Sequence, residues 1–328
     1  MTGTGVLDVA GRTAARDWIA GVLDLPAAAL TVRVVRERSW GDVWRLSSPA
    51  GVHWFKAPHP RLRGEVPLRA LLESRAAERV LPLVAADHER GWQLTADAGR
   101  TLAALARDDA GAPRPGEVAR LYAGLAGALA AMQEAVGEDD LRGRGLTEFD
   151  PAKAELSLLR ELAPFRALPA AHPAHCTAEE EARAVAVRAA LAMRWEDCGG
   201  PADPLGLDHN DLHGGNAFLG ADGRVLVSDV GDAVLGHPGA SLRALLVPVR
   251  AEHGADAAET VRTAWLAARG QDHAAGRERL ELAMLLAVPQ RLRAWGALRS
   301  PETWAAYAEW ITALWRDIGT PVDQLTTA

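Results

Sequence analysis

The sequence LDHNDLHGGNAFL, residues 207–219, is the most informative stretch of this 328-residue chain. It places Asp211 and Asn216 five positions apart, on a segment that Gly214 and Gly215 keep from forming a regular helix. In a rigid loop with this spacing, an aspartate can accept the proton of a hydroxyl group while an asparagine amide oxygen holds a magnesium ion. The stretch therefore predicts a phosphoryl-transfer loop with Asp211 as the proton acceptor.

A second acidic residue follows where such chemistry needs one. Residues 216–219 are typical of a short strand, residues 220–223 of a turn, and residues 224–228 of a returning strand that ends at Asp229. This hairpin would bring Asp229 beside Asn216. Both supply hard oxygen ligands of the kind that magnesium prefers next to a phosphate chain.

Two other interpretations of this stretch compete with phosphoryl transfer. His209 and His213 are four residues apart, as in a zinc metalloprotease helix, but that motif needs Glu where this chain has Asn210, and the two glycines disfavour a helix. A polar surface loop is the second alternative. It accounts neither for the spacing from Asp211 to Asn216 nor for the downstream acid.

The pair of motifs HNDLHGGN (209–216) and SDVGDA (228–233) resembles the catalytic and metal loops of the aminoglycoside phosphotransferase and choline kinase superfamily, which has the protein-kinase fold. The resemblance covers about residues 31–245 by recognisable motifs. It implies an α+β, bilobal molecule. Residues 1–96 would form a nucleotide-binding N-lobe with a five-stranded antiparallel sheet, and residues 97–328 a mainly helical C-lobe with the catalytic loop, the metal site and the acceptor site.

This fold also requires a strand lysine that holds the α and β phosphates and pairs with a glutamate on the next helix. Only Lys56 and Lys153 are lysines among 36 basic residues, and Lys56 lies in a strand-like run. A compact ammonium is not interchangeable with a guanidinium at a phosphate site. Glu65 is the preferred partner because its spacing from Lys56 resembles that of the family. Glu73 lies more securely inside the helix predicted at 67–80 and stays an alternative.

The other nucleotide contacts are expected from a turn and from the segment between the lobes. Ser39, Trp40 and Gly41 form a turn that would cover the triphosphate with backbone N–H groups. Thr95 and Asp97 belong to the hinge, whose backbone would bind the purine edge of ATP or GTP. The strands of the predicted sheet are 31–36, 43–47, 52–57, 81–86 and 92–96.

Apolar periodicity and Pro or Gly boundaries predict a helical second half. Ser241 stands where many relatives have an Asp, and we expect this change to affect how the catalytic loop is braced rather than its chemistry. The predicted helices are 115–136, 151–162, 178–195, 240–251, 255–269, 277–297 and 301–318.

Several further side chains have two interpretations. His209 is grouped with the catalytic residues, and we expect it to brace the loop by a hydrogen bond rather than to transfer a proton. His213 is placed beside the cleft without an assigned role, and Asp232 either supports the metal ligands or caps a turn. A core-facing stripe is expected from apolar residues that recur at helical spacing, namely Trp304, Ala308, Ile311 and Trp315. The wall of an acceptor cleft could contain Trp265, Trp295 or Trp310.

Composition and charge limit the partners. No apolar run approaches the length of a membrane span and no signal peptide is recognisable, so we expect a cytoplasmic protein that does not bind membranes. No basic patch with interleaved aromatic residues supports nucleic-acid binding. Residues 1–96 carry a net charge of +3 and residues 97–328 of −10. The acidic half either steers a cationic acceptor such as an aminoglycoside or is simply a solvated surface.

The sequence thus predicts a kinase that uses ATP or GTP with Mg²⁺ to phosphorylate a hydroxyl group of a small molecule. An antibiotic acceptor, in resistance or self-protection, is preferred. A metabolite kinase of the sugar, amino sugar, choline or homoserine type is the alternative within this class. A nucleotide-binding pseudoenzyme is the alternative outside it, although Lys56, Asp211, Asn216 and Asp229 are all present.

Overall fold

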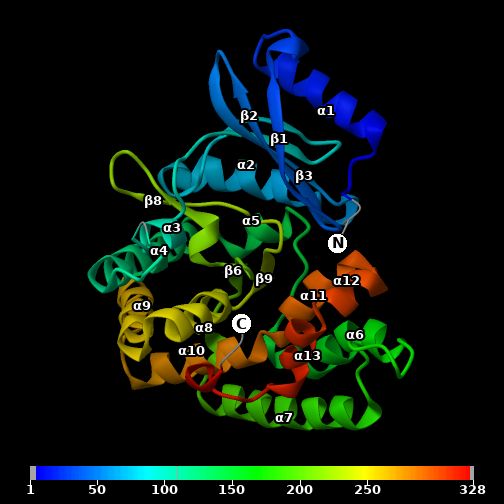
Figure 1. Cartoon of the computed structure of the whole chain (residues 1–328). Coiled ribbons are helices and arrows are strands. Elements are labelled where there is room, and N and C mark those ends of the chain that lie inside the picture. The colour runs from blue at the N-terminus through cyan, green and yellow to red at the C-terminus, as the bar shows by residue number, and fades with distance from the viewer. Residues whose placement is uncertain (1–4, 109, 326–328) are drawn as a thin grey trace.

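The computed structural model describes residues 5–108 and 110–325. Its first part is a five-stranded antiparallel sheet, as the sequence predicts, and the strand order is β1-β2-β3-β5-β4. Figure 1 shows this sheet standing above a second part that consists mostly of helices. The strands are β1 (Thr31–Arg38), β2 (Gly41–Ser48), β3 (Gly51–Pro58), β4 (Leu83–Asp87) and β5 (Trp92–Ala96).

Two helices flank the sheet. Helix α1 (Val9–Val22), which was not predicted, begins at Asp8, whose carboxylate accepts a hydrogen bond from the Gly11 amide. Ile19 from α1 packs with buried residues of the sheet. Helix α2 (Glu65–Ala76) begins and ends earlier than predicted, and a 3₁₀ turn at 77–79 follows it. It lies between the sheet and the helical part in Figure 1.

The largest apolar core joins α2 to the helical part. It contains buried residues of α4 (Pro115–Ala135), α8 (Leu242–His253) and α9 (Ala255–Ala268). A second core contains residues of α6 (Ala154–Arg166) and α7 (Ala178–Asp197), with Trp304, Ile311 and Trp315. Ala308 packs against it, so the predicted stripe of Trp304, Ala308, Ile311 and Trp315 does face a core. Two short helices, α3 (Leu102–Leu105) and α5 (Glu138–Arg142), complete this region.

Two predicted long helices are each divided, which corrects the sequence-based boundaries. The predicted 277–297 helix is α10 (Ala274–Leu286) followed by α11 (Val288–Leu298), with Pro289 in the first turn of α11. Proline lacks the N–H that a continuous helix needs, but it fits a first turn. The predicted 301–318 helix is α12 (Pro301–Ala306) and α13 (Ala308–Arg316), separated at Tyr307.

Two small two-stranded sheets hold the 209–216 loop. Strand β6 (Gly206–Asp208) leads into the loop and pairs with β9 (Val234–Gly236). Strand β7 (Ala217–Leu219) leads out of it and pairs with β8 (Val225–Val227), which confirms the predicted hairpin. The loop is therefore fixed at both ends.

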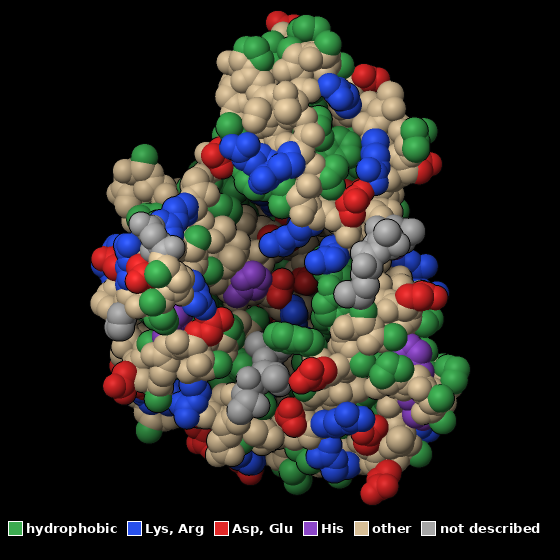
Figure 2. All heavy atoms as spheres, in the orientation of Figure 1, with side chains coloured by type: hydrophobic (Ala, Val, Ile, Leu, Met, Phe, Trp, Pro, Cys, Tyr) green, Lys and Arg blue, Asp and Glu red, His purple; other side chains and the backbone are tan. Residues whose placement is uncertain are grey.

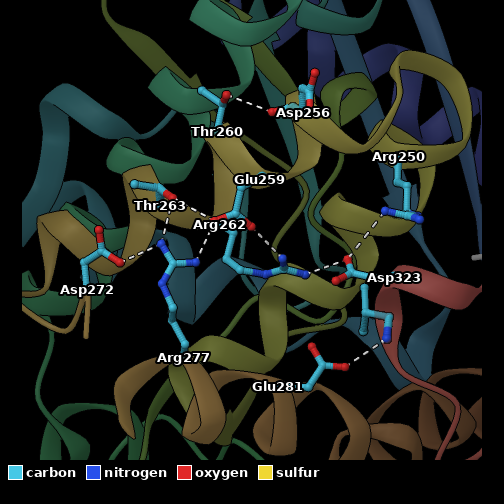
Figure 3. Close-up of polar contacts among 11 residues, drawn as sticks. Arg250, Asp256, Glu259, Thr260, Arg262, Thr263, Asp272, Arg277, Glu281 and Asp323 are labelled. Atoms are coloured by element: carbon cyan, nitrogen blue, oxygen red, sulfur yellow. Dashed lines mark hydrogen bonds and ion pairs between the residues drawn. The ribbon is translucent and has the colours of Figure 1, made fainter. Parts of the chain in front are cut away.

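Ion pairs attach the end of the described chain to the helical part (Figure 3). Asp323 pairs with Arg262 of α9 at 2.7 Å, and the Val322 amide donates to Glu281 of α10 at 2.9 Å. Arg262 also pairs with Glu259 at 2.7 Å. Within residues 5–108 and 110–325, no helix is long and apolar enough to cross a membrane.

Candidate active site

Buried polar contacts brace the 209–216 loop from below. The Ser241 hydroxyl donates to Asp208 at 2.9 Å and accepts from the His209 amide at 2.8 Å. His209 is fully buried, and its Nε2 lies 3.1 Å from the Ser228 carbonyl oxygen. Burial is the main cause that lowers the pKa of His209. These contacts support a bracing role for His209, and its full burial argues against direct contact with substrate.

Asn210 ties the loop to α11. It has a positive φ of 61°, a conformation that Asn tolerates better than most residues. Its Nδ2 donates to the carbonyl oxygens of Asp232 at 3.1 Å and Gln290 at 3.0 Å. Arg291 donates to its carbonyl oxygen. These bonds fix the backbone that carries the next residue, Asp211.

The Asp211 carboxylate is held by a cation that the sequence analysis did not identify. Arg291 Nη2 lies 3.1 Å from Asp211 Oδ1, and Arg291 also approaches Asp232 at 3.7 Å. His213 Nε2 lies on the other side, 3.9 Å from Asp211 Oδ2. The signal for Arg291 was weak, because it is one arginine among many on a predicted helix.

The hairpin brings the two predicted magnesium ligands together. Ser228 donates its amide to the Asn216 carbonyl oxygen at 2.9 Å, which places Asp229 next to Asn216. Asn216 Nδ2 donates to the Asp211 carbonyl oxygen at 3.0 Å, so its other amide atom, Oδ1, is the one available to a metal. Asp229 has a positive φ of 59° and a side chain that is 44% exposed. An amide oxygen and an accessible carboxylate fit magnesium.

No cluster of three or more His, Cys, Asp or Glu side chains suited to a metal occurs among residues 5–108 and 110–325. Two protein oxygens are nevertheless a common number for magnesium, which keeps several waters and takes other ligands from phosphates. The donor set therefore fits magnesium bound together with a nucleotide, and zinc has no support from the described residues.

Lys56 contacts two carboxylates at once. Its Nζ lies 2.6 Å from Glu65 Oε2 and 2.5 Å from Asp229 Oδ1. Burial by itself would lower the pKa of Lys56, but the two anions outweigh it and raise that pKa. Glu65 is thus the partner of Lys56. Glu73, the alternative, instead accepts a hydrogen bond from the Leu83 amide at 2.9 Å.

A narrow cleft between the sheet and the helical part is lined by Lys56, Glu65 and Asp229. Figure 2 shows the molecule hollowed at this level, with acidic, basic and histidine side chains around the opening. Arg36 and Arg38, which the sequence analysis did not single out, project from β1 into the cleft wall and add positive charge near Lys56. The predicted nucleotide residues that line it are Trp40, Gly41, Lys56 and Glu65, together with Asp211 and Asp229.

Three predicted nucleotide residues lie elsewhere. The Ser39 hydroxyl lies 2.8 Å from Thr303 Oγ1, so it joins the turn to α12 rather than facing the cleft. Thr95 pairs with Trp54 in the sheet. Asp97 accepts a hydrogen bond from Trp54 Nε1 at 2.9 Å. Neither Thr95 nor Asp97 lines the narrow cleft, so their proposed contact with a base rests on the family resemblance.

The turn at Trp40 is also held from the helical side. The Trp40 ring packs edge-on against Trp295 of α11, with centroids 6.2 Å apart, and against Tyr307, with centroids 5.5 Å apart. Trp295 therefore belongs to this contact, which we call the aromatic clasp (Trp40, Trp295 and Tyr307), and not to an acceptor cleft.

A larger cavity of about 360 Å³ lies on the other side of Asp211. Trp310, one of the three tryptophans suggested for the wall of an acceptor cleft, lines this cavity. Trp265 is fully buried and donates to Gln133 at 3.0 Å, so it has a structural position. His213 also lines this cavity.

Solved structures with a similar fold were found, but no protein-family model and no curated protein matches the sequence. A macrolide 2'-phosphotransferase type I is 15% identical with a TM-score of 0.59, covering 97% of this chain and 99% of that one. A choline/ethanolamine kinase family protein from Mesorhizobium loti is 17% identical with a TM-score of 0.61, covering 94% and 95%. The GDP and kanamycin complex of APH(2")-IIia is 16% identical with a TM-score of 0.50, covering 85% and 93%.

Identities this low carry the architecture and not the substrate. They agree with the five-stranded sheet and the helical second part described above. The chain therefore shares its fold with these solved phosphotransferases and with this choline/ethanolamine kinase family protein.

Proposed function

We propose that this protein is a small-molecule kinase that transfers the γ-phosphate of ATP or GTP to a hydroxyl group. Residues 1–96 would bind the nucleotide, and residues 97–328 would supply the catalytic loop, the metal ligands and the acceptor site. An antibiotic acceptor is the first choice, because a macrolide 2'-phosphotransferase and a kanamycin complex are among the similar structures.

The observation that carries this proposal is the position of Asp211. It lines both the narrow cleft with Lys56 and Asp229 and the larger cavity with Trp310. A carboxylate at the junction of two cavities is placed to contact a hydroxyl from one side while phosphate approaches from the other. Such positioning, with charge neutralisation, accounts for most of the catalysis in phosphoryl transfer.

Each residue then has a defined task. Asp211 orients the acceptor hydroxyl and takes its proton as the bond to phosphorus forms, and Arg291 holds that carboxylate in place. Lys56, fixed by Glu65, binds the α and β phosphates. Asn216 and Asp229 would hold magnesium. When bound, magnesium neutralises charge on the phosphates.

The contact between Lys56 and Asp229 has a consequence for binding. In a complex with nucleotide and magnesium, Lys56 would bind phosphate and Asp229 would bind the metal ion. Binding must therefore replace this ion pair with contacts to the ligand.

A panel of hydroxyl acceptors with γ-labelled ATP and GTP tests the proposal. The panel contains macrolides, aminoglycosides, nucleoside antibiotics, amino sugars, choline and homoserine. Transfer of label to one of them, abolished in Asp211→Asn, is the expected result. Binding of nucleotide without transfer or hydrolysis would instead favour the pseudoenzyme, and transfer only to a metabolite would identify the alternative kinase.

A further inference from the structure

The larger cavity next to Asp211 has a mostly apolar wall. Its lining includes Trp310 and Leu314 of α13 and Pro248 and Val249 of α8. The Trp310 side chain is 49% exposed, so part of its ring is accessible to a ligand. The wall fits an acceptor whose body is largely apolar.

The carboxylates in this wall are already paired with arginines, which does not favour binding of a polycation. Two carboxylates line the cavity, and each has an arginine partner: Arg291 holds Asp211, and Arg107 contacts Glu252. Burial lowers the pKa of His253, so this side chain is neutral at neutral pH. Although residues 97–328 have a net negative charge, the cavity wall carries no unpaired anion among the described residues that line it.

Arg243 is the cation that remains. It lies at the start of α8, lines the cavity and is only 9% exposed. Its Nη1 is buried without a hydrogen-bond partner, and no carboxylate of the described residues lies within ion-pair distance of its guanidinium. Glu281 and Asp317 act on it only from farther away, and the nearby charge of Arg291 opposes them.

A buried, unpaired guanidinium is costly, because removal from water is not repaid by a partner. Such a group at a cavity wall is therefore a candidate for completion by a ligand. The fork of donors in arginine matches a carboxylate in geometry as well as in charge.

We propose that Arg243 is the specificity-determining residue of the acceptor site, and that the acceptor is a hydroxyl compound with a largely apolar body and a carboxylate or comparable anionic group that pairs with Arg243. This inference rests on the proposed function for its use of a hydroxyl acceptor. It replaces the expectation of a cationic acceptor, which rested on the net charge of residues 97–328 alone.

The test compares probes that differ only in charge. One set is 10-hydroxydecanoate, 10-hydroxydecanamide and 10-aminodecan-1-ol, and a second set has the same three groups on a 4-(hydroxymethyl)cyclohexane ring. Kd for each probe is measured on the full chain by calorimetry, without nucleotide. We expect the carboxylate of at least one set to bind about tenfold or more tighter than its amide and its amine.

Three variants locate the preference. Arg243→Gln should remove it, bringing the carboxylate and amide within about twofold, and Arg243→Lys should keep part of it. Arg250→Gln on the same helix, outside the cavity wall, is the matched control and should leave it unchanged. Since Arg243 has no partner to lose, its Gln variant should unfold at a temperature no lower than that of the wild type.

The outcomes separate this inference from the proposed function. Tightest binding of the amines, equal binding of all three probes, or no binding of any probe would overturn the role of Arg243. An anion preference that survives Arg243→Gln would do so as well. Phosphate transfer is measured separately with γ-labelled ATP and GTP. Transfer without a preference for the anionic probes would refute only this inference. A preference for the anionic probes without transfer to any acceptor or to water would refute only the kinase activity.

Discussion

At the residue scale, a few side chains differ in their contacts, and we propose different roles for them. Asp211 faces two cavities and is held by Arg291, whereas His209 is buried beneath the loop. Lys56 bridges Glu65 and Asp229. Lys56, Asp211 and Asp229 could be singled out from the sequence because each belongs to a recognisable local motif. The sequence did not predict Arg291 or Arg243, which approach the site from distant helices and have no motif of their own.

Asp211→Asn should keep the shape of the site but remove proton acceptance and the negative charge. We expect turnover to fall on the order of 100-fold or more, while nucleotide affinity changes little. Steady-state kinetics with the acceptor found by the panel, together with nucleotide titration, measures both quantities. Turnover like that of the wild type would remove Asp211 from the mechanism.

Lys56→Arg should lose activity, because a planar guanidinium cannot take the position of an ammonium between a carboxylate and phosphates. Glu65→Gln should show a smaller loss. Residues that act as one unit lose their joint contribution once, so the double variant should lose less than the two single losses combined. Glu73→Gln is the matched control on the same helix, and losses that simply add would mean that Lys56 and Glu65 do not act together.

At the element scale, the 209–216 loop has a defined position because several neighbouring elements hold it. Strands β6 and β7 hold its ends, Ser241 and Asp208 brace it from below, and α11 bonds to Asn210. The hairpin and the sheet could be predicted because their periodicity is local. The division of the predicted 277–297 helix could not be judged from periodicity, because α10 and α11 both continue the apolar pattern across Pro289.

The pH dependence of stability should show the cost of burying Asp208. Burial raises the pKa of Asp208 to about 6, although hydrogen bonds from Ser241 and Asn210 act in the opposite direction. Because this pKa lies above the 3.8 of an exposed Asp, the folded state binds the proton more tightly than the unfolded state between these values. The group therefore destabilises the fold above pH 6, and this cost shrinks as the pH falls below 6.

Comparison with Asp208→Asn isolates this effect. Between about pH 7.5 and pH 5, the free energy of unfolding of the wild type should rise by about 1 kcal/mol relative to that of Asp208→Asn. Urea denaturation at the two pH values measures it. Asp17→Asn, at an exposed position, is the control. A difference between wild type and Asp208→Asn that stays constant with pH would contradict a buried carboxyl group with a raised pKa.

The aromatic clasp predicts a separate effect on nucleotide binding. Trp40→Ala removes the ring that packs on Trp295 and Tyr307, so the β1–β2 turn should lose its support on the helical side. We expect nucleotide affinity to fall about 3- to 10-fold, because ordering the turn on binding then costs conformational entropy. Calorimetric titration measures it. Unchanged affinity would mean that the clasp does not support the phosphate-covering turn.

At the scale of the whole molecule, the fold was predictable and the acceptor was not. Lys56, Asp211 and Asp229 belong to motifs recognisable in the sequence, and a solved structure of similar fold covers 94% of this chain. The larger cavity, which we propose for the acceptor, is built from side chains far apart in sequence, such as Tyr122, Arg243 and Trp310, so no local pattern describes it. Net charge does not describe this cavity either, because it counts acidic residues wherever they lie.

Binding of nucleotide with and without magnesium tests the central claim most directly. Calorimetric titration of ATP and GTP into the wild type, Asp229→Ala and Asn216→Ala decides it. The account predicts that one of the two nucleotides binds the wild type in the presence of Mg²⁺, and that removing Mg²⁺ or either ligand weakens binding about tenfold or more. Failure of both nucleotides to bind the wild type with Mg²⁺, or binding that neither Mg²⁺ nor these two substitutions affects, would contradict it.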